Sequence, residues 1–242
     1  MIEIVTHCYA ERLPHYARTL CYQLSSLALH PPKTKVCITV CMMPDDKVTH
    51  NVTAWYKGMT RCRLDVPLLG FQYLTLPRLG RRAIGRNIAA KRTKADIVWF
   101  ADVDQVFRDG ILDRLADFDW PKGASMIYPR TIQISATHEI GKVQTDRLSD
   151  GPELIDVNPA EFVDKHYNRA IGGVQIVRGD TAREMGYLNN NKKYQTPCSE
   201  GKPFADFRDD LAFRSAAQIR GQIVGVDLPG MYRLRHTETT HT

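Results

Sequence analysis

The sequence predicts one α/β domain built on a central, mostly parallel β-sheet flanked by helices. Its 242 residues suit a single large domain, because one hydrophobic core still serves a chain of this length. Strand-like and helix-like segments alternate through the first hundred residues. A continuous apolar run fills the strand expected at residues 96–101, as is typical of strands buried on both faces of a parallel sheet.

The elements follow from hydrophobic spacing and from Pro and Gly positions. In the first half we expect strands at 2–5, 35–43, 71–76 and 96–101, and helices at 13–29, 48–57 and 81–94. In the less regular second half we expect helices at 111–118 and 209–220, and strands at 125–134 and 170–177. Residues 138–165 and 189–204 are polar and are expected to form loops, which in compact domains are usually functional or disordered.

The composition excludes several classes of protein. Hydrophobic residues make up 43% and charged residues 25%, so disorder, collagen and coiled coil fit poorly. The net charge of +6 favours phosphate-bearing ligands but is too small to indicate a nucleic-acid binder. The N-terminus lacks the basic start of a signal peptide, and no apolar run reaches the length of a membrane span. We therefore expect a cytoplasmic protein.

Two carboxylates follow the apolar strand directly. Asp102 and Asp104 flank Val103, and alternation along an extended chain turns both carboxylates to one side and Val103 into the core. A pair of carboxylates at the open end of a strand suits Mg²⁺ or Mn²⁺. The alternative is a pair of loop acids that cap the next helix, and we favour the metal site because a buried strand precedes the pair.

A basic segment lies just upstream of this pair, and most of it suits a solvated helix face. Arg86 differs because Gly85 precedes it, and glycine inside a helix costs about 1 kcal/mol. Such a glycine is more credible where a ligand approaches closely, so a diphosphate contact is a candidate role for Arg86.

Three further features are open to two interpretations each. Asp209 and Asp210 begin the last helix, either as caps or as a general base. Gly172 and Gly173 indicate either a bulge or backbone left bare for a ligand. His236, near the C-terminus, is either a metal ligand or a tail histidine without a role, and His7 is expected to be structural or exposed to solvent.

Together these segments resemble the nucleotide-sugar-dependent glycosyltransferases of the GT-A fold, a Rossmann-like fold, and especially their family-2-like group. Residues 80–104, GRRAIGRNIAAKRTKADIVWFADVD, match that family's Arg-Asn helix and its strand ending in Asp-x-Asp. AIGGVQIVRGDTAREMGYL resembles its glycine-rich strand, and FRDDLAFRSAAQIRG resembles the acidic helix start that carries its base. The resemblance covers most of the chain in the same order.

The resemblance implies a site and a division of the domain. Residues 1–107 would bind the nucleotide sugar and residues 108–242 the acceptor. Asp104 would coordinate the metal, Asp102 would contact ribose or a metal-bound water, and His236 would complete the metal site. The base and ribose would lie near Thr6, Tyr9 and Asp45.

The implied reaction is transfer of a sugar, with UDP as the default nucleotide, to a hydroxyl of a glycan or lipid-linked acceptor. The metal and Arg86 would neutralise the leaving diphosphate, and one carboxylate base implies inversion. The acidic motif departs from the family's usual spacing, so the base is assigned to Asp209 with Asp210 as the close second. A lipid-linked acceptor would make peripheral membrane association possible.

Two rival functions remain. Asp102 and Asp104 also fit the first motif of haloacid-dehalogenase-like, Mg²⁺-dependent phosphatases, although that motif normally ends the first strand of its domain. The basic segment also fits a non-enzymatic module that binds nucleotides or polyanions. Its lack of interleaved aromatic residues disfavours binding to single-stranded nucleic acid.

Overall fold

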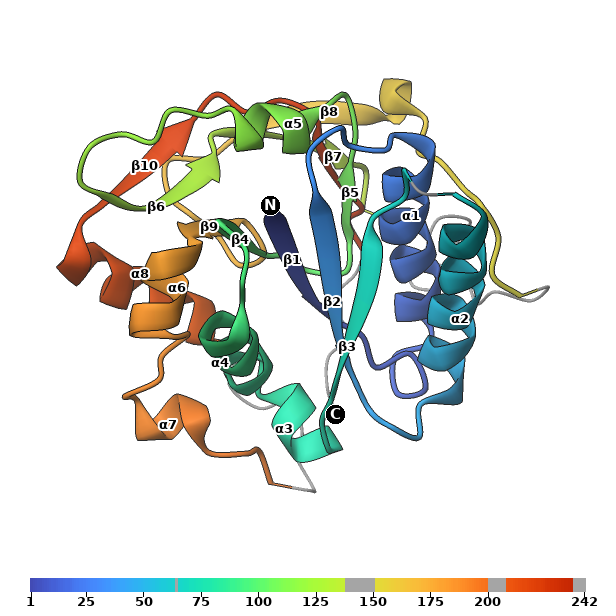
Figure 1. Ribbon diagram of the computed structural model, residues 1–242, viewed down its shortest axis with the longest axis horizontal. Helices are drawn as coiled ribbons and strands as arrows, with labels where there is room; N and C mark the ends of the chain where they lie inside the picture. Colours follow the sequence, from blue (N-terminus) through green and yellow to red (C-terminus); the bar gives the residue numbers. More distant parts are fainter. Residues whose placement is uncertain (64, 138–150, 200–207, 237–242) are drawn as a thin grey trace.

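The structure is a computed structural model that describes residues 1–63, 65–137, 151–199 and 208–236. In these ranges the chain forms a seven-stranded sheet with helices on both faces and a separate four-stranded sheet (Figure 1). The larger sheet carries most of the core, and the smaller one forms a wall of the cavity described below.

The seven-stranded sheet has the order β10-β6-β9-β4-β1-β2-β3. Its strands are β1 (Ile2–His7), β2 (Val36–Met42), β3 (Leu68–Tyr73), β4 (Ile97–Phe100), β6 (Ala124–Pro129), β9 (Gln175–Arg178) and β10 (Gln222–Val226). All pairings are parallel except those of β9, which runs antiparallel to both β4 and β6. The expected α/β fold with a mostly parallel sheet is confirmed.

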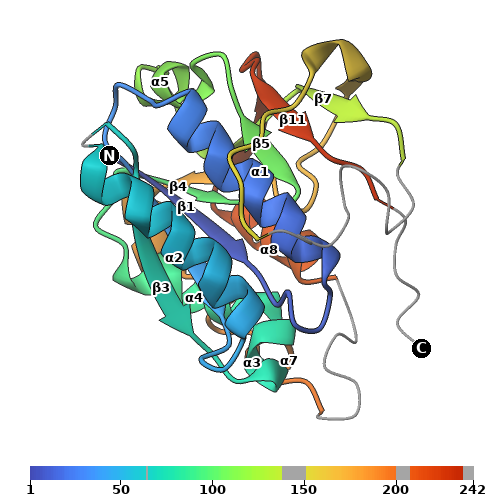
Figure 2. The same ribbon diagram turned by 90° about the vertical axis from the view of Figure 1, so that its right-hand side faces the viewer.

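Helices cover both faces of this sheet (Figures 1 and 2). One face carries α1 (His15–Leu29) and α2 (Lys47–Cys62), and the other carries α4 (Arg82–Arg92), α6 (Gly179–Met185) and α8 (Asp209–Arg220). The short helices α3 (Leu76–Gly80) and α7 (Lys192–Gln195) contact α4, and α5 (Ile111–Ala116) follows β5. Among the described residues, no helix combines the length and the apolar character needed to cross a bilayer.

The central strands are apolar throughout because both of their faces are buried. In β4, Trp99 packs into the core under α1 and α2, while its neighbour Phe100 packs into the core under α4 and α8. Phe100 also meets the rings of Tyr187 and Phe213 edge-on. Because side chains alternate along the strand, β4 contributes to both hydrophobic cores.

The four-stranded sheet has the order β5-β11-β7-β8. Its strands are β5 (Gln105–Phe107), β11 (Met231–Arg233), β7 (Thr131–Ser135) and β8 (Phe162–His166), and a 3₁₀ turn at Pro159–Glu161 precedes β8. β5 follows Asp104 directly, and β11 runs antiparallel to it. The acidic pair is therefore held between β4, a central strand of the larger sheet, and β5 of the smaller one.

Several sequence expectations are corrected by this arrangement. The expected single strand at 125–134 is two strands, because the chain leaves the large sheet at Arg130 and enters the small one as β7. The strand expected at 170–177 is shorter and begins at Gln175. The loop expectation is wrong for β8 and α7, while residues 138–150 and 200–204 of the expected loops lie outside the described residues.

Candidate active site

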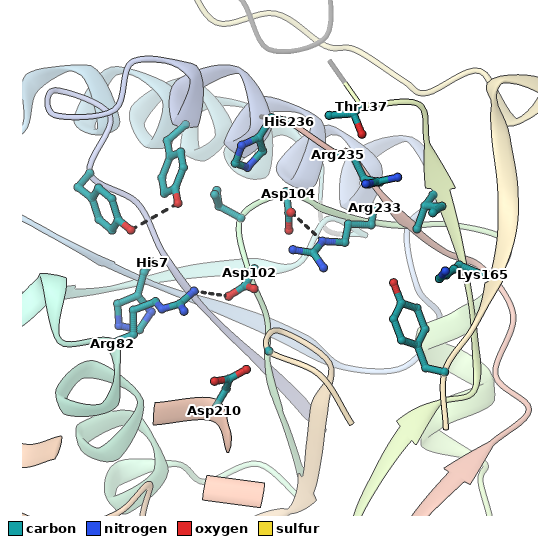
Figure 3. Close-up of a pocket in the computed structure, with 16 residues that line it drawn as sticks. His7, Arg82, Asp102, Asp104, Thr137, Lys165, Asp210, Arg233, Arg235 and His236 are labelled. Atoms are coloured by element: carbon teal, nitrogen blue, oxygen red, sulfur yellow. Dashed lines mark hydrogen bonds and ion pairs between the residues drawn. The ribbon is translucent and has the colours of Figure 1, made fainter. Parts of the chain in front are cut away.

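A cavity of about 880 Å³ opens beyond the carboxyl ends of β1 and β4 and faces the four-stranded sheet (Figure 3). Its charged lining consists of the carboxylates Asp102, Asp104 and Asp210 and the cationic side chains Arg82, Lys165, Arg233 and Arg235. The remaining lining residues are His7, Tyr9, Tyr16, Val103, Ile134, Thr137, Tyr167, Gly172 and His236. The cavity therefore brings together side chains from early and late parts of the sequence.

Asp102 is held by two arginines from one face of α4. Its Oδ1 accepts hydrogen bonds from Arg82 Nη1 at 3.0 Å and from Arg86 Nη2 at 2.9 Å. Burial alone would raise the pKa of the Asp102 carboxyl, but Arg82 and Arg86, together with Arg233, outweigh burial and lower it to about 2. Asp102 is therefore ionised at neutral pH.

Arg86 lies beneath the cavity and does not line it. Its side chain is fully buried and donates from Nη1 to the hydroxyl of Tyr187 at 3.0 Å. That hydroxyl donates to Gln175 Oε1 at 2.9 Å, and Gln175 Nε2 donates to the backbone oxygen of Asp210 at 2.8 Å. Arg86 thus connects Asp102 to the start of α8, and Arg82, one helical turn earlier, is the arginine of α4 that lines the cavity.

Asp104 is paired from the small sheet. Its Oδ2 accepts a hydrogen bond from Nε of Arg233 in β11 at 2.9 Å, and its backbone oxygen accepts one from the Leu234 nitrogen at 2.9 Å. Its Oδ1 is buried and has no hydrogen-bond partner among the described residues. Asp104 therefore retains one carboxylate oxygen to offer to a ligand.

The two acids at the start of α8 have different environments. Asp209 is 2% exposed and does not line the cavity, whereas Asp210 does. A Cβ added to Gly172 would lie 2.8 Å from Asp210 Oδ2, so glycine at this position leaves room for the carboxylate. Of the two sequence candidates for a base, the geometry favours Asp210, not the first choice Asp209.

Gly173 has a related role beside Asp102. Its φ is +79°, and an added Cβ would lie 2.3 Å from Gln105 Nε2 and 2.7 Å from the Asp102 carboxyl carbon. Its backbone oxygen accepts hydrogen bonds from Trp99 Nε1 at 3.1 Å and from Gln105 Nε2 at 2.6 Å. The two glycines leave space for neighbouring carboxylates of the site.

Histidine and tyrosine side chains form the wall nearest α1. Tyr9 and Tyr16 are joined by a hydrogen bond of 3.4 Å between their hydroxyls, and the ring of His236 lies 4.9 Å from that of His15. His7 is buried and lines the cavity, so of the two expectations for this residue, exposure to solvent is wrong. Burial, assisted by Arg86 and Arg82, holds the pKa of His7 well below its ordinary value, so its ring is neutral.

The other expected nucleotide contacts are only partly brought together. Tyr9 lines the cavity, as does Gly172. Thr6 is fully buried and Asp45 is exposed in the turn after β2, and neither lines the cavity. Sequence reasoning missed Arg82, Tyr16, Lys165, Tyr167, Arg233 and Arg235. The signal that could have found Arg82 is its spacing of one helical turn from Arg86.

The oxygens of the acidic pair suit a hard divalent cation. The free, buried Oδ1 of Asp104 is the kind of ligand that Mn²⁺ and Mg²⁺ prefer. His236 lines the same cavity. Within the described ranges, no group of three His, Cys, Asp or Glu side chains is arranged to hold a metal ion. A metal site at Asp102, Asp104 and His236 stays a prediction.

No protein-family model and no curated protein matches the sequence. Solved structures match the fold over nearly the whole chain. TarS 1–349 of S. aureus has a TM-score of 0.54 at 16% identity, and the alignment covers 96% of this chain and 60% of the TarS 1–349 chain. The chain has the GT-A fold. The mannosyltransferase PcManGT of Pyrobaculum calidifontis, in complex with GDP-Man and Mn²⁺, has a TM-score of 0.56 at 10% identity, covering 99% of this chain and 58% of that one. The galactosyltransferase LgtC, in complex with donor and acceptor sugar analogues, has a TM-score of 0.51 at 14% identity. The alignment covers 96% of this chain and 86% of LgtC.

These similarities confirm the expected GT-A fold. The chain spans about three fifths of TarS 1–349, so the remainder of that protein has no counterpart in this alignment. The phosphatase alternative gains no support from these structures, which are glycosyltransferases.

Proposed function

We propose that the protein is a glycosyltransferase that moves a sugar from a nucleoside-diphosphate sugar to a hydroxyl group of an acceptor. The observation that carries the proposal is the meeting of Asp102, Asp104 and Asp210 in one cavity of a GT-A fold. UDP is the default nucleotide from the sequence resemblance. GDP belongs beside it in any test, because PcManGT is in complex with GDP-Man.

The acidic pair would hold Mn²⁺ or Mg²⁺. Asp104 offers its buried Oδ1, and Asp102 and His236 line the same cavity. When bound, the ion would supply positive charge against the negative charge that develops on the leaving diphosphate. Arg86 holds Asp102 in place from below, so the acid does not have to be reoriented when the donor binds.

Arg82 is better suited than Arg86 to contact the diphosphate directly. It lines the cavity, whereas Arg86 is fully buried and bonded to Asp102 and Tyr187. A guanidinium group presents several donors to phosphate oxygens. Tyr9 is the candidate for the base and ribose end. Thr6 and Asp45 remain more distant candidates, which a donor complex would test.

Asp210 would act as the general base. It faces the cavity, and Gln175 fixes its backbone oxygen with a hydrogen bond of 2.8 Å. The acceptor hydroxyl would attack the anomeric carbon as Asp210 takes its proton, and the bond to the diphosphate oxygen would break. A single carboxylate in this role implies inversion, because double displacement requires a separate nucleophile.

The test of the base compares two isosteric variants. Asp210→Asn should lower transfer about 10²- to 10⁴-fold, the usual contribution of general-base catalysis, and leave nucleotide affinity unchanged. Asp209→Asn is the matched control one residue away and should retain transfer. Transfer would be followed by release of nucleoside diphosphate, and affinity by calorimetry. Loss of transfer in the Asp209 variant alone would return the role to Asp209.

The donor and the metal can be identified without an acceptor. Thermal unfolding would be followed with UDP, GDP and dTDP, each with and without Mn²⁺. A ligand at ~100 times its dissociation constant adds ~2.7 kcal/mol, a shift of roughly 5–10 °C for a chain of this size. A Mn²⁺-dependent shift with one nucleotide is expected, and it should disappear in Asp104→Ala. No shift with any nucleotide would contradict the proposal.

A further inference from the structure

The small-sheet wall of the cavity carries two cations that the donor chemistry does not use. Lys165 comes from β8, and Arg235 lies two residues beyond Arg233 of β11. Thr137, which follows β7, lines the cavity beside them. In Figure 3 these three residues lie on one side of Asp104, while Arg82 and His7 lie on the other. The cavity therefore has a second cationic end.

Strand register puts this wall on one face of the small sheet. Lys165 pairs with Ile132, and Arg233 pairs with Ile134, two residues further along β7. Directly paired residues project to the same face of a sheet, as do residues two apart. Asp164, the neighbour of Lys165 in β8, therefore projects to the opposite face and does not neutralise it from within the strand.

The pairing of charges differs sharply along the cavity. Arg82 is paired with Asp102, and Arg233 is paired with Asp104. Among the described residues, the side chains of Lys165 and Arg235 make no ion pair or hydrogen bond; only the backbone nitrogen of Arg235 is bonded, to Ser135 Oγ at 2.9 Å. Two cations that have no counter-charge in the described part of the chain thus face the cavity in which the transfer would occur.

We infer that Lys165 and Arg235 bind a phosphate group carried by the acceptor. An arginine fork and a lysine ammonium together suit the several oxygens and the charge of a phosphate, and the Thr137 hydroxyl adds a neutral donor. Both cations belong to the half of the chain that follows the acidic pair, opposite Arg82. The inference rests on the proposed function, because it names the class of acceptor whose hydroxyl Asp210 would deprotonate.

The experiment measures binding of a small phosphate probe with the donor end filled. Titration of glycerol 3-phosphate, and of glycerol as the uncharged control, would be followed by calorimetry with saturating UDP and Mn²⁺. The phosphate probe should bind and glycerol should not. Lys165→Ala/Arg235→Ala should weaken the probe at least about tenfold, because each hydrogen bond to a charged group contributes a tenfold factor or more.

A matched variant controls for the loss of charge. Arg61→Ala/Lys122→Ala removes two exposed cations outside the cavity and should leave probe binding unchanged. UDP affinity should be the same in all three proteins. If the Lys165/Arg235 variant loses UDP affinity and keeps the probe, the cations serve the donor diphosphate and the inference is wrong. Absence of probe binding in the wild-type protein would also overturn it.

A second arm separates the sources of the phosphate. Vesicles of phosphatidylcholine with and without phosphatidic acid would be sedimented with wild-type protein and with the Lys165/Arg235 variant. Capture that requires phosphatidic acid and both cations would indicate a lipid-borne phosphate, whereas probe binding without capture would indicate a water-soluble acceptor. If the protein binds the phosphate probe but no nucleotide, the anion site is supported and the proposed transferase function is wrong.

Discussion

At the end of the cavity built by the seven-stranded sheet, charged groups are paired within the protein: Asp102 receives hydrogen bonds from Arg82 and Arg86. At the end built by the four-stranded sheet, Lys165 and Arg235 lack such partners among the described residues. Paired charges hold their geometry before a ligand arrives, which is what stabilisation of developing charge requires. Cations without an internal counter-charge can form ion pairs with an anionic ligand that enters the cavity. The difference separates a reaction end from a recognition end.

The largest effect on stability is expected from removing Arg86, the buried arginine that holds Asp102 from beneath the cavity. Arg86→Ala removes a fully buried side chain and its hydrogen bonds to Asp102 and Tyr187, and it leaves Arg82 to pair with Asp102. It should lower the free energy of unfolding by about 3–5 kcal/mol, because two hydrogen bonds made by a charged group are lost. Denaturant unfolding would measure it. Arg86→Met should recover part of the loss, because it refills the buried volume while the two hydrogen bonds stay absent. A loss below about 1 kcal/mol for Arg86→Ala would contradict the pairing.

A glycine substitution tests how tightly the reaction end is packed. Gly173→Ala brings a Cβ against Gln105 and the Asp102 carboxyl at a positive φ, and should cost about 2–4 kcal/mol from overpacking and backbone strain. Gly123→Ala is the control, since Gly123 has a φ of +78° and no atom within 4 Å of the added Cβ. Its cost should be the strain alone, about 1 kcal/mol. Equal losses in the two variants would show that packing at Gly173 contributes nothing.

Variants of Arg82 and Arg86 should affect different properties: Arg82→Ala should weaken nucleotide binding, whereas Arg86→Ala should lower stability. Arg82→Ala should weaken nucleoside-diphosphate binding about tenfold, because a guanidinium–phosphate contact is lost, while the buried Arg86–Asp102 pair remains. Calorimetry with UDP and GDP, beside unfolding of the same protein, measures both quantities. Unchanged nucleotide affinity would exclude Arg82 from the diphosphate site.

The smallest effect is expected at the boundary between the two ends. Arg233→Gln removes the cation paired with Asp104 and should strengthen Mn²⁺ binding a few-fold, because the ion no longer competes with a guanidinium group for the carboxylate. The paramagnetic resonance signal of free Mn²⁺ measures this without any turnover. Weaker Mn²⁺ binding would mean that Arg233 orients Asp104 for the ion.

The parts of the fold that can be predicted are those encoded by the pattern of neighbouring residues. The apolar run that forms β4 is followed directly by Asp102 and Asp104, so the sequence predicts the strand and the acidic pair together. Helical spacing showed that residues of α4 share a face, but the depth of Arg86 depends on Tyr187, about a hundred residues away. Arg233 was missed because β11 has three residues, too few to show an alternating pattern, and because its partner β5 lies far away in the sequence. Arg235 lies beyond the end of this strand, so no local pattern indicated where it would face.

The edge position of β8 has a consequence for how this protein can change. Of the strands in the described ranges, β8 pairs with β7 alone, and four of its five residues are exposed. Replacing Lys165 would therefore alter the charge of the cavity wall with little disturbance to either hydrophobic core. By contrast, the residues that hold Asp102 are also part of the protein's interior and are constrained by folding. If Lys165 and Arg235 bind the acceptor, its chemistry can diverge in evolution by one or two exchanges while the transfer machinery is conserved.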